Sequence, residues 1–226
     1  MFTLYSADFT GNPGNCSYPH KTVVMNTDNL REAVCHDYVC AEYKNHYRNG
    51  ENFISADCLP VDCDNDHSED PKDWVTPADV LEAFPGVSIA IHYSRFNNRE
   101  KNGKPARPKF HVLFPIDRMT DATLYSDMKK LVNSIFPYFD TKALDAARFF
   151  FGTQEPNVEL YPGRMNLTEF LNDDEFDAGL PGGHKKDAVI PEGSRNAVMS
   201  RFAGIVIKKY GDSEKAYQSF LEKAAT

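Results

Sequence analysis

The sequence predicts a mixed α+β protein, and three observations carry this prediction. Residues 87–93 and 109–116 are rich in β-branched and apolar side chains, which is typical of strands. Residues 120–136 repeat their apolar side chains with a helical period. A chain of 226 residues, of which 41% are hydrophobic, is long enough to bury a complete core without disulfides.

The predicted elements begin with a helix over 26–41, where apolar residues recur at helical spacing. The chain then turns at Asn49-Gly50 into a strand that leads to an acidic stretch. A second helix starts at Thr76-Pro77, because a capping hydroxyl precedes a proline at the first helical position. It ends at Pro85-Gly86, and the strand over 87–93 follows.

The strand over 109–116 and the helix after it each present one apolar face. In the strand, Lys109 and His111 share one face, and the alternating residues on the other face pack inward: Phe110, Val112, Phe114 and Ile116. The helix over 120–136 directs its apolar residues to one side: Leu124, Met128, Leu131, Val132 and Ile135. A further strand is predicted over 149–151.

The stretch around Asp62 and Asp64 offers two carboxylates at alternating positions. Both project from the same face of a strand, while Val61 and Cys63 pack inward. Such a pair forms a hard-oxygen site that suits Mg²⁺ or Mn²⁺. A third carboxylate is supplied by the segment after the helix over 120–136, either by Asp140 or by Asp145; Asp145 can alternatively pair with Arg148.

Two other interpretations of the acidic stretch stay open. It can be a solvated turn, which is the usual role of acidic clusters in an acidic protein. It can also be a calcium loop, since Asp62, Asp64 and Asp66 fall at the first three ligand positions of an EF-hand. However, His67 replaces the glycine of the sharp turn and Asp73 replaces the last glutamate.

Opposite charges are segregated along the chain, although the net charge is −8. The net charge alone excludes a protein that is attracted to nucleic acid over its whole surface. Residues 57–82 contain nine acidic residues and one lysine, whereas residues 95–109 contain six basic residues and one acidic residue. This pattern predicts a metal site next to a phosphate-binding loop. The basic residues expected to bind DNA are Arg95, Arg99, Lys101, Lys104 and Arg107.

The five cysteines are odd in number and irregularly spaced, so they do not form a disulfide framework. A zinc site can be drawn from residues 16–40, but no Cys-x2-Cys pair is present, and structural thiols are favoured. The N-terminus lacks the features of a signal peptide, and no apolar run approaches the length of a membrane span. We therefore expect a cytoplasmic protein with no membrane partner.

Three motifs in this order resemble the archaeo-eukaryotic primase superfamily, in particular the primase-polymerases of plasmids, phages and other mobile elements. The motifs are Asp62-x-Asp64, Lys109-x-His111, and Asp140 after two aromatic residues with Arg148 eight residues later. The resemblance extends from about residue 52 to residue 152. Lys109 stands where other members have serine, and Phe151 stands where some relatives keep a second basic residue.

The resemblance implies an RRM-like antiparallel sheet flanked by helices and a DNA primase or polymerase that works by nucleotidyl transfer. It implies that Asp62, Asp64 and Asp140 hold two Mg²⁺ or Mn²⁺ ions and form the catalytic set with His111. Lys109, His111 and Arg148 are implied to contact the incoming nucleotide. The implied partners are a single-stranded DNA template, a primer strand and NTP or dNTP.

Three regions are predicted: a catalytic domain over 1–165, a linker over 166–190, and a helical segment over 191–226 that resembles the start of a primase C-terminal domain. The final helical pattern lacks a stop signal, so we expect a fragment of a longer protein with a helicase region or other replication proteins as partners. Two rival functions stay open. One is a non-catalytic single-stranded-DNA-binding replication initiator module, and the other is a metal-dependent nuclease.

Overall fold

The computed structural model describes residues 1–101, 103–171 and 217. It confirms the predicted α+β class, with antiparallel pairing between the strands of two sheets and few helices. The strands are β1 (Phe2–Ser6), β2 (His20–Val24), β3 (Tyr38–Val39), β4 (Ala41–Tyr43), β5 (Phe53–Cys63), β6 (Ile89–Tyr93), β7 (Phe110–Met119), β8 (Phe149–Phe150) and β9 (Val158–Tyr161). The α-helices are α1 (Thr27–Val34), α2 (Pro77–Ala83), α3 (Ala122–Ile135) and α4 (Leu167–Leu171). Short 3₁₀ turns are η1 (Lys44–His46), η2 (Gly50–Asn52), η3 (Pro71–Asp73) and η4 (Thr141–Ala143).

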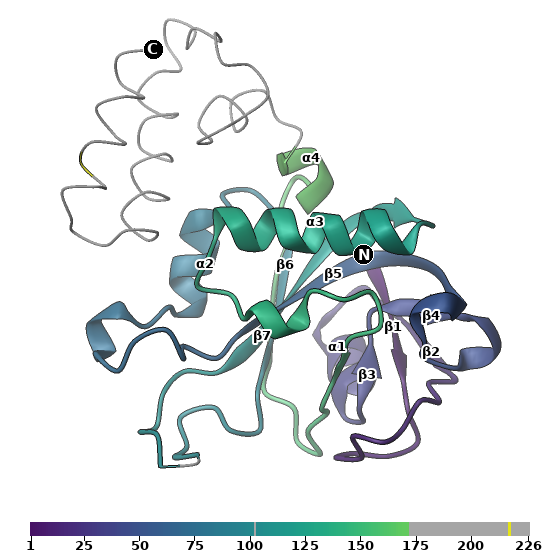
Figure 1. The fold of residues 1–226 in the computed structure, drawn as a ribbon, viewed down its shortest axis with the longest axis horizontal. Coiled ribbons are helices and arrows are strands. Elements are labelled where there is room, and N and C mark those ends of the chain that lie inside the picture. Colours follow the sequence, from purple (N-terminus) through teal and green to yellow (C-terminus); the bar gives the residue numbers. More distant parts are fainter. Residues whose placement is uncertain (102, 172–216, 218–226) are drawn as a thin grey trace, which may run out of the picture.

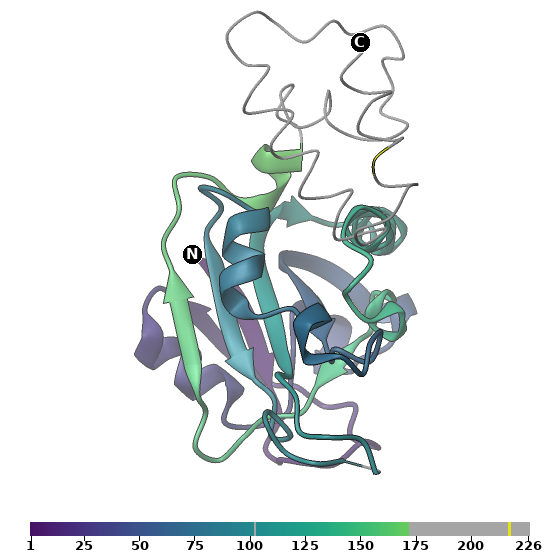
Figure 2. The ribbon, with the colours of Figure 1, turned by 90° about the vertical axis from the view of Figure 1, so that its left-hand side faces the viewer.

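The described residues form three layers (Figures 1 and 2). The central layer is a five-stranded sheet in the order β4-β5-β7-β6-β9. One of its faces packs against α2, α3 and α4 in a core that contains Phe84, Phe114 and Val132. Its other face packs against α1 and the four-stranded sheet β2-β1-β3-β8, through residues such as Leu4 and Leu113.

The alternation predicted for 109–116 is confirmed in β7. Phe110, Val112, Phe114 and Ile116 all lie in the core on the helical side of the sheet. His111 therefore points to the opposite face, toward the four-stranded sheet. The same alternation in β5 buries Val61 and Cys63 on the helical side and turns Asp62 toward the face that carries His111.

The second predicted helix is confirmed as α2, which begins with a full capping box. The Thr76 side chain accepts from the Asp79 backbone N–H, and the Asp79 carboxylate accepts from the Thr76 backbone N–H. The helix predicted over 26–41 is only half as long as expected, because α1 ends at Val34 and Tyr38 begins β3. The intervening Asp37 is fully buried and its carboxylate accepts hydrogen bonds from the backbone of Gly11, Asn12 and Gly152. These long-range bonds stop the helix, and sequence periodicity does not reveal them.

The helix predicted over 120–136 is confirmed as α3, but its buried face differs from the prediction. Leu124 and Leu131 are 58% and 46% exposed, whereas Tyr125, Lys129 and Val132 are buried. The Tyr125 hydroxyl donates to the Cys58 carbonyl of β5 at 2.7 Å, which fixes this rotation of the helix. The predicted face therefore included two exposed leucines and left out the buried Tyr125 and Lys129.

Strands β1, β2 and β9 and helix α4 lie outside the predicted elements. Strands β1 and β2 form a hairpin-like pair near the N-terminus, and β9 forms an edge of the five-stranded sheet. Leu167 and Phe170 of α4 are buried in the main core, so this start of the predicted linker belongs to the folded domain. The rest of the linker and the predicted helical segment, except Tyr217, lie outside the described residues. No described helix is both long and apolar enough to span a membrane.

Candidate metal and nucleotide site

Neighbouring strands bring an aspartate and two histidines into one row across the central sheet. Asp62 of β5 is paired with His111 of β7, and His111 is paired with His92 of β6. The row is largely shielded from solvent, since Asp62 is 6% and His111 is 8% exposed. His111 Nδ1 lies 3.1 Å from Asp62 Oδ1, and the Phe150 ring packs edge-on against the His111 ring. The imidazole is therefore held by one hydrogen bond and by ring contacts with Phe150 and His92.

Three carboxylates from two distant segments converge at this row. Asp62, Asp64 and Asp140 each offer an oxygen atom, and these atoms all lie within 4.8 Å of one another. The Asp140 backbone N–H donates to the Asp62 carbonyl at 2.7 Å, which ties η4 to the end of β5. We refer to these three residues as the carboxylate cluster.

Asp145 lies outside the carboxylate cluster. Its carboxylate accepts from the Ala147 backbone N–H at 2.8 Å, and its carbonyl accepts from Lys129 Nζ at 2.8 Å. Arg148 does not pair with Asp145 but lies with NH2 3.8 Å from Asp62 Oδ2. Of the two alternatives for a third carboxylate, the geometry therefore favours Asp140.

Positively charged side chains lie next to the carboxylate cluster. Lys109 Nζ lies 3.1 Å from Asp64 Oδ1 and 3.5 Å from Asp66 Oδ1, and the lysine is 4% exposed. Burial alone raises the pKa of the Asp62 carboxyl, but the charges of His111, Arg148 and Lys109 more than offset it. The net effect is a pKa below the ordinary value, so Asp62 is ionised at neutral pH.

The donor set suits divalent cations of the Mg²⁺ or Mn²⁺ type. All three ligands are carboxylates, which are hard oxygen donors, and like charges so close together need a compensating cation. Asp62 and Asp64 have ion-pair partners, but no lysine, arginine or histidine of the described residues lies within ion-pair distance of Asp140. A metal ion would supply the missing positive charge.

The calcium-loop interpretation is wrong, because Asp66 is not part of the cluster. Asp66 pairs with Lys104 and Lys109, at 3.3 and 3.5 Å. The segment before it is strand β5 and not a helix. Within the described residues, the cysteines and histidines of the first forty positions form no group able to hold a metal, and all five cysteines are free thiols.

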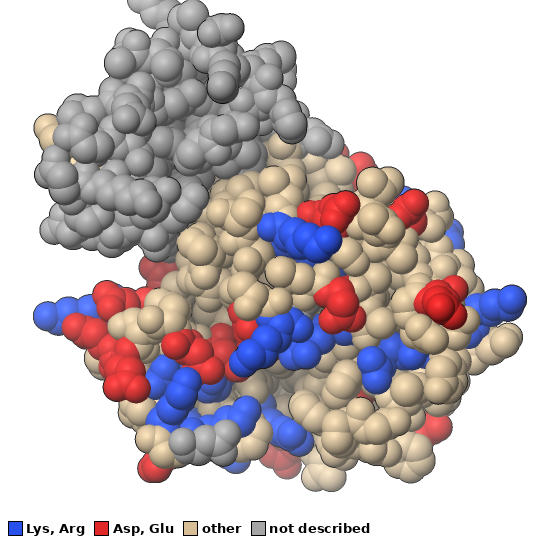
Figure 3. Space-filling view, in the orientation of Figure 1, with Lys and Arg blue, Asp and Glu red and all other residues tan. Residues whose placement is uncertain are grey.

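The basic loop between β6 and β7 is divided between structural and exposed residues. Arg107 is only 1% exposed, donates to the carbonyls of Asn65 and Ser68, and lies over the Trp74 ring. Arg107 was predicted to bind DNA, but its guanidinium is buried and anchors the loop after β5. Arg95, Arg99 and Lys104 are exposed and Lys101 is partly exposed. Figure 3 shows acidic and basic side chains intermixed over these two loops.

Several residues that support the site were missed by the sequence analysis. His92 is fully buried and lies within hydrogen-bond distance of Tyr38 Oη and Thr153 Oγ1, at 3.1 and 3.2 Å. Burial and the neighbouring His111 hold the pKa of His92 well below its ordinary value, so it is neutral at pH 7. Tyr43 and Arg48 donate to the carbonyls of Ala146 and Ala147. Of these residues, only His92 has a signal in the sequence, because it is a histidine within the apolar strand over 87–93.

Neither a protein-family model nor a curated protein sequence matches the chain. Among solved structures, the chain is similar to the AEP domain of the primase-polymerase (PrimPol) from cyanophage S-2L. The two share 13% sequence identity with a TM-score of 0.40, over 72% of this chain and 81% of that chain.

Proposed function

We propose that this protein is a nucleotidyltransferase of the primase-polymerase type, which makes or extends primers on single-stranded DNA with NTP or dNTP. The observation that carries the proposal is the convergence of Asp62, Asp64 and Asp140 within 4.8 Å beside a buried lysine and histidine. Two-metal phosphoryl chemistry requires carboxylates that hold the metal ions and nearby cations that bind the phosphate groups. The order of the three sequence motifs supports the same class.

The metal ligands in this proposal are the three aspartates of the carboxylate cluster. Divalent ions held there would lower the pKa of an attacking 3′-hydroxyl and stabilise negative charge on the phosphates. The protein itself contributes position: the Asp140 N–H bond to Asp62 joins two separate segments at the site. Because Asp62 is buried, its charge interacts more strongly with its neighbours than a charge on the surface would.

His111 and Lys109 are suited to hold the phosphates of the incoming nucleotide. A protonated imidazole donates from both nitrogens, so while Nδ1 donates to Asp62, Nε2 can donate to a phosphate oxygen. Lys109 already lies between Asp64 and Asp66 and needs only a small movement to exchange one carboxylate for a phosphate. Arg148 offers a third cation beside Asp62, and its buried Nε has no hydrogen-bond partner.

Primer extension with Mn²⁺ tests the proposal directly. The substitutions Asp62→Asn, Asp64→Asn and Asp140→Asn keep the side-chain shape but replace a charged metal ligand by a neutral one. Each should lower the rate about a hundredfold to a thousandfold, the scale set by losing one electrostatic contact in the transition state. Asp145→Asn is the matched control, since an asparagine oxygen can still accept from the Ala147 N–H. It should retain nearly full activity.

Two further measurements complete the test. Mn²⁺ affinity, measured by calorimetry without nucleotide, should fall in the three cluster variants and not in Asp145→Asn. Equal extension by Asp140→Asn and Asp145→Asn would refute the assignment. Shortening of a labelled strand without added nucleotides would identify a nuclease, and strand binding without product would identify a binding module.

A further inference from the structure

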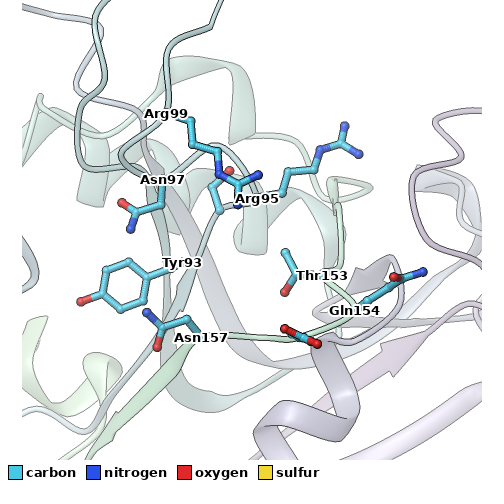
Figure 4. Close-up of a pocket in the computed structure, with 9 residues that line it drawn as sticks. Tyr93, Arg95, Asn97, Arg99, Thr153, Gln154 and Asn157 are labelled. Atoms are coloured by element: carbon cyan, nitrogen blue, oxygen red, sulfur yellow. The ribbon is translucent and has the colours of Figure 1, made fainter.

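A polar pocket of about 500 Å³ opens where β6 ends, beside the buried His92. Its wall contains two arginines and one tyrosine together with amide and hydroxyl groups (Figure 4). The lining residues are Tyr93, Ser94, Arg95, Asn97, Arg99, Thr153, Gln154, Glu155 and Asn157. The carboxylate cluster does not include this pocket, but Arg95 and Arg99 belong to the basic loop that is expected to bind DNA.

The direction of the strands places this pocket on the same edge of the sheet as the carboxylate cluster. Strands β5 and β6 both pair antiparallel with β7, so their C-terminal ends and the N-terminal end of β7 share one edge. That edge carries Asp64, Lys109 and Ser94 in order, and the Ser94 N–H donates to the Lys109 carbonyl at 2.9 Å. Adjacent strands are about 4.8 Å apart, so the pocket lies about 10 Å from the cluster, across β7.

The two arginines of the pocket are available to an anion. Within the described chain neither guanidinium forms an ion pair, although Glu155 also lines the pocket. Arg95 is fixed by lying over the Phe151 ring, 4.1 Å from its centroid. Guanidinium groups bind phosphate oxygens in a bidentate fashion.

The remaining wall offers a surface for a base. The Tyr93 hydroxyl donates to Glu159 Oε1 at 3.1 Å, which orients the aromatic ring at the side of the pocket. Gln154 and Asn157 are exposed amides that can donate to and accept from the edge of a base. An aromatic ring beside cations is the usual platform for single-stranded nucleic acid.

We propose that this pocket binds one nucleotide unit of single-stranded DNA, with the phosphate on Arg95 and Arg99 and the base against Tyr93. This deepens the proposed function and rests on it for the identity of the strand, which is one that reaches the carboxylate cluster. Lys109 lies between the two sites, so a strand or phosphate chain that crosses β7 meets a cation at each step. The volume exceeds what a lone phosphate needs and suits a whole nucleotide.

Strand binding without metal tests the pocket separately from catalysis. The assay is fluorescence anisotropy of a labelled oligothymidylate with the whole chain in EDTA over a range of salt concentrations. The double variant Arg95→Ala/Arg99→Ala should bind about tenfold more weakly, and its plot of log affinity against log salt should be shallower by about 0.7, the value for one phosphate of a single strand. Tyr93→Leu should weaken binding about fivefold to a hundredfold with an unchanged salt slope, because stacking carries no charge.

The matched control is Arg31→Ala, which removes an exposed arginine of α1 that pairs with Asp28 and lies outside the pocket. It should change neither the affinity nor the slope. Unchanged affinity and slope in the double arginine variant overturn the proposal. Loss of affinity for free dTTP with full retention of strand binding also overturns it, because the pocket then takes a free nucleotide.

A crosslinking experiment avoids reliance on variants that fold poorly. A strand that carries 4-thiothymidine should label the wild-type chain within 93–99 or 153–157, and labelling confined to other segments overturns the proposal.

The outcomes of primer extension and strand binding together separate this proposal from the proposed function. If the wild type extends no primer but the pocket variants lose strand affinity, only the proposed function fails. If the wild type extends primers and the variants bind normally, only the pocket assignment fails.

Discussion

Lys129 is a buried lysine whose removal should stabilise the protein and impair its activity together. It is 1% exposed on the inner face of α3, and burial lowers the pKa of its amine from 10.5 to about 8. Its Nζ donates to the Asp145 carbonyl at 2.8 Å, within the segment that joins Asp140 to Arg148. The lysine therefore opposes folding through its charge while it holds a segment of the candidate site. The test variant is Lys129→Met.

The size of the effect follows from the two pKa values. At about 1.4 kcal/mol for each tenfold change in proton affinity, a fall from 10.5 to about 8 costs the charged lysine about 3 kcal/mol on folding. Methionine removes this cost but also removes the hydrogen bond to the Asp145 carbonyl, worth about 1 kcal/mol. At pH 7 the variant should be more stable than the wild type by about 2 kcal/mol.

The sign of the pH dependence identifies the cause. Below pH 8 the lysine is charged in both the folded and unfolded chains, so the full cost is present. Between pH 8 and 10.5 the unfolded chain binds a proton that the folded chain does not, and the stability of the wild type rises with pH. The advantage of Lys129→Met should therefore shrink by about 2 kcal/mol between pH 7 and about pH 9.5.

Urea denaturation followed by circular dichroism at both pH values measures this difference. The control is Lys130→Met, which removes the exposed neighbour that pairs with Asp127 and should not stabilise the protein at pH 7. An advantage of Lys129→Met that stays constant with pH would contradict the reasoning. Primer extension by Lys129→Met should fall even though the protein is more stable, because stability gained at a functional site often costs activity.

Two further predictions concern single residues. His111→Ala should raise the apparent nucleotide KM about tenfold to a hundredfold, the scale of one hydrogen bond to a charged group. The control is His20→Ala, which removes an exposed histidine paired with Asp8 and should leave the KM unchanged. An unchanged KM in His111→Ala would remove this residue from the nucleotide site. Gly152→Ala should lower the free energy of unfolding by about 2 kcal/mol or more, because a Cβ there would clash with the His36 backbone carbonyl. Gly50→Ala, with open space around it, is the control, and equal denaturation midpoints for the two variants would contradict the predicted clash.

Residues whose positions depend on local periodicity were predicted well from the sequence. The alternation in β7 correctly separated His111 from its apolar neighbours, and the capping box at Thr76 correctly marked the start of α2. The pairing of Asp62 with His111 follows from the same alternation once β5 and β7 are adjacent. Burial of alternate residues is a local property, so a strand pattern contains most of this information.

Features that depend on contacts between distant segments were not predictable in this way. Asp37 ends α1 by binding backbone groups more than twenty positions before it and more than a hundred after it. Arg107 has the sequence environment of an exposed loop residue, yet it is buried because the loop after β5 folds over it. Charge and hydropathy give no warning of such cases, because a charged side chain is buried only when specific partners compensate for its desolvation.

The candidate site is fixed mainly by the sheet, except for the segment 139–148, which carries Asp140 and Arg148 outside any strand. Side chains hold this segment by its carbonyl groups: Asn133 donates to Phe139, Lys129 to Asp145, Tyr43 to Ala146 and Arg48 to Ala147. Bonds to carbonyl oxygens fix the backbone without occupying the Arg148 guanidinium, which lies near Asp62. The Asp140 carboxylate accepts one hydrogen bond, from the Lys142 backbone N–H to Oδ1 at 2.9 Å, and its other oxygen is left for a metal ion. Asn133 and Lys129 belong to α3, which precedes the segment, whereas Tyr43 at the end of β4 and Arg48 after η1 lie about a hundred positions away in the sequence. Replacement of any of them should therefore reduce activity through the position of Asp140, although none of them touches the carboxylate cluster.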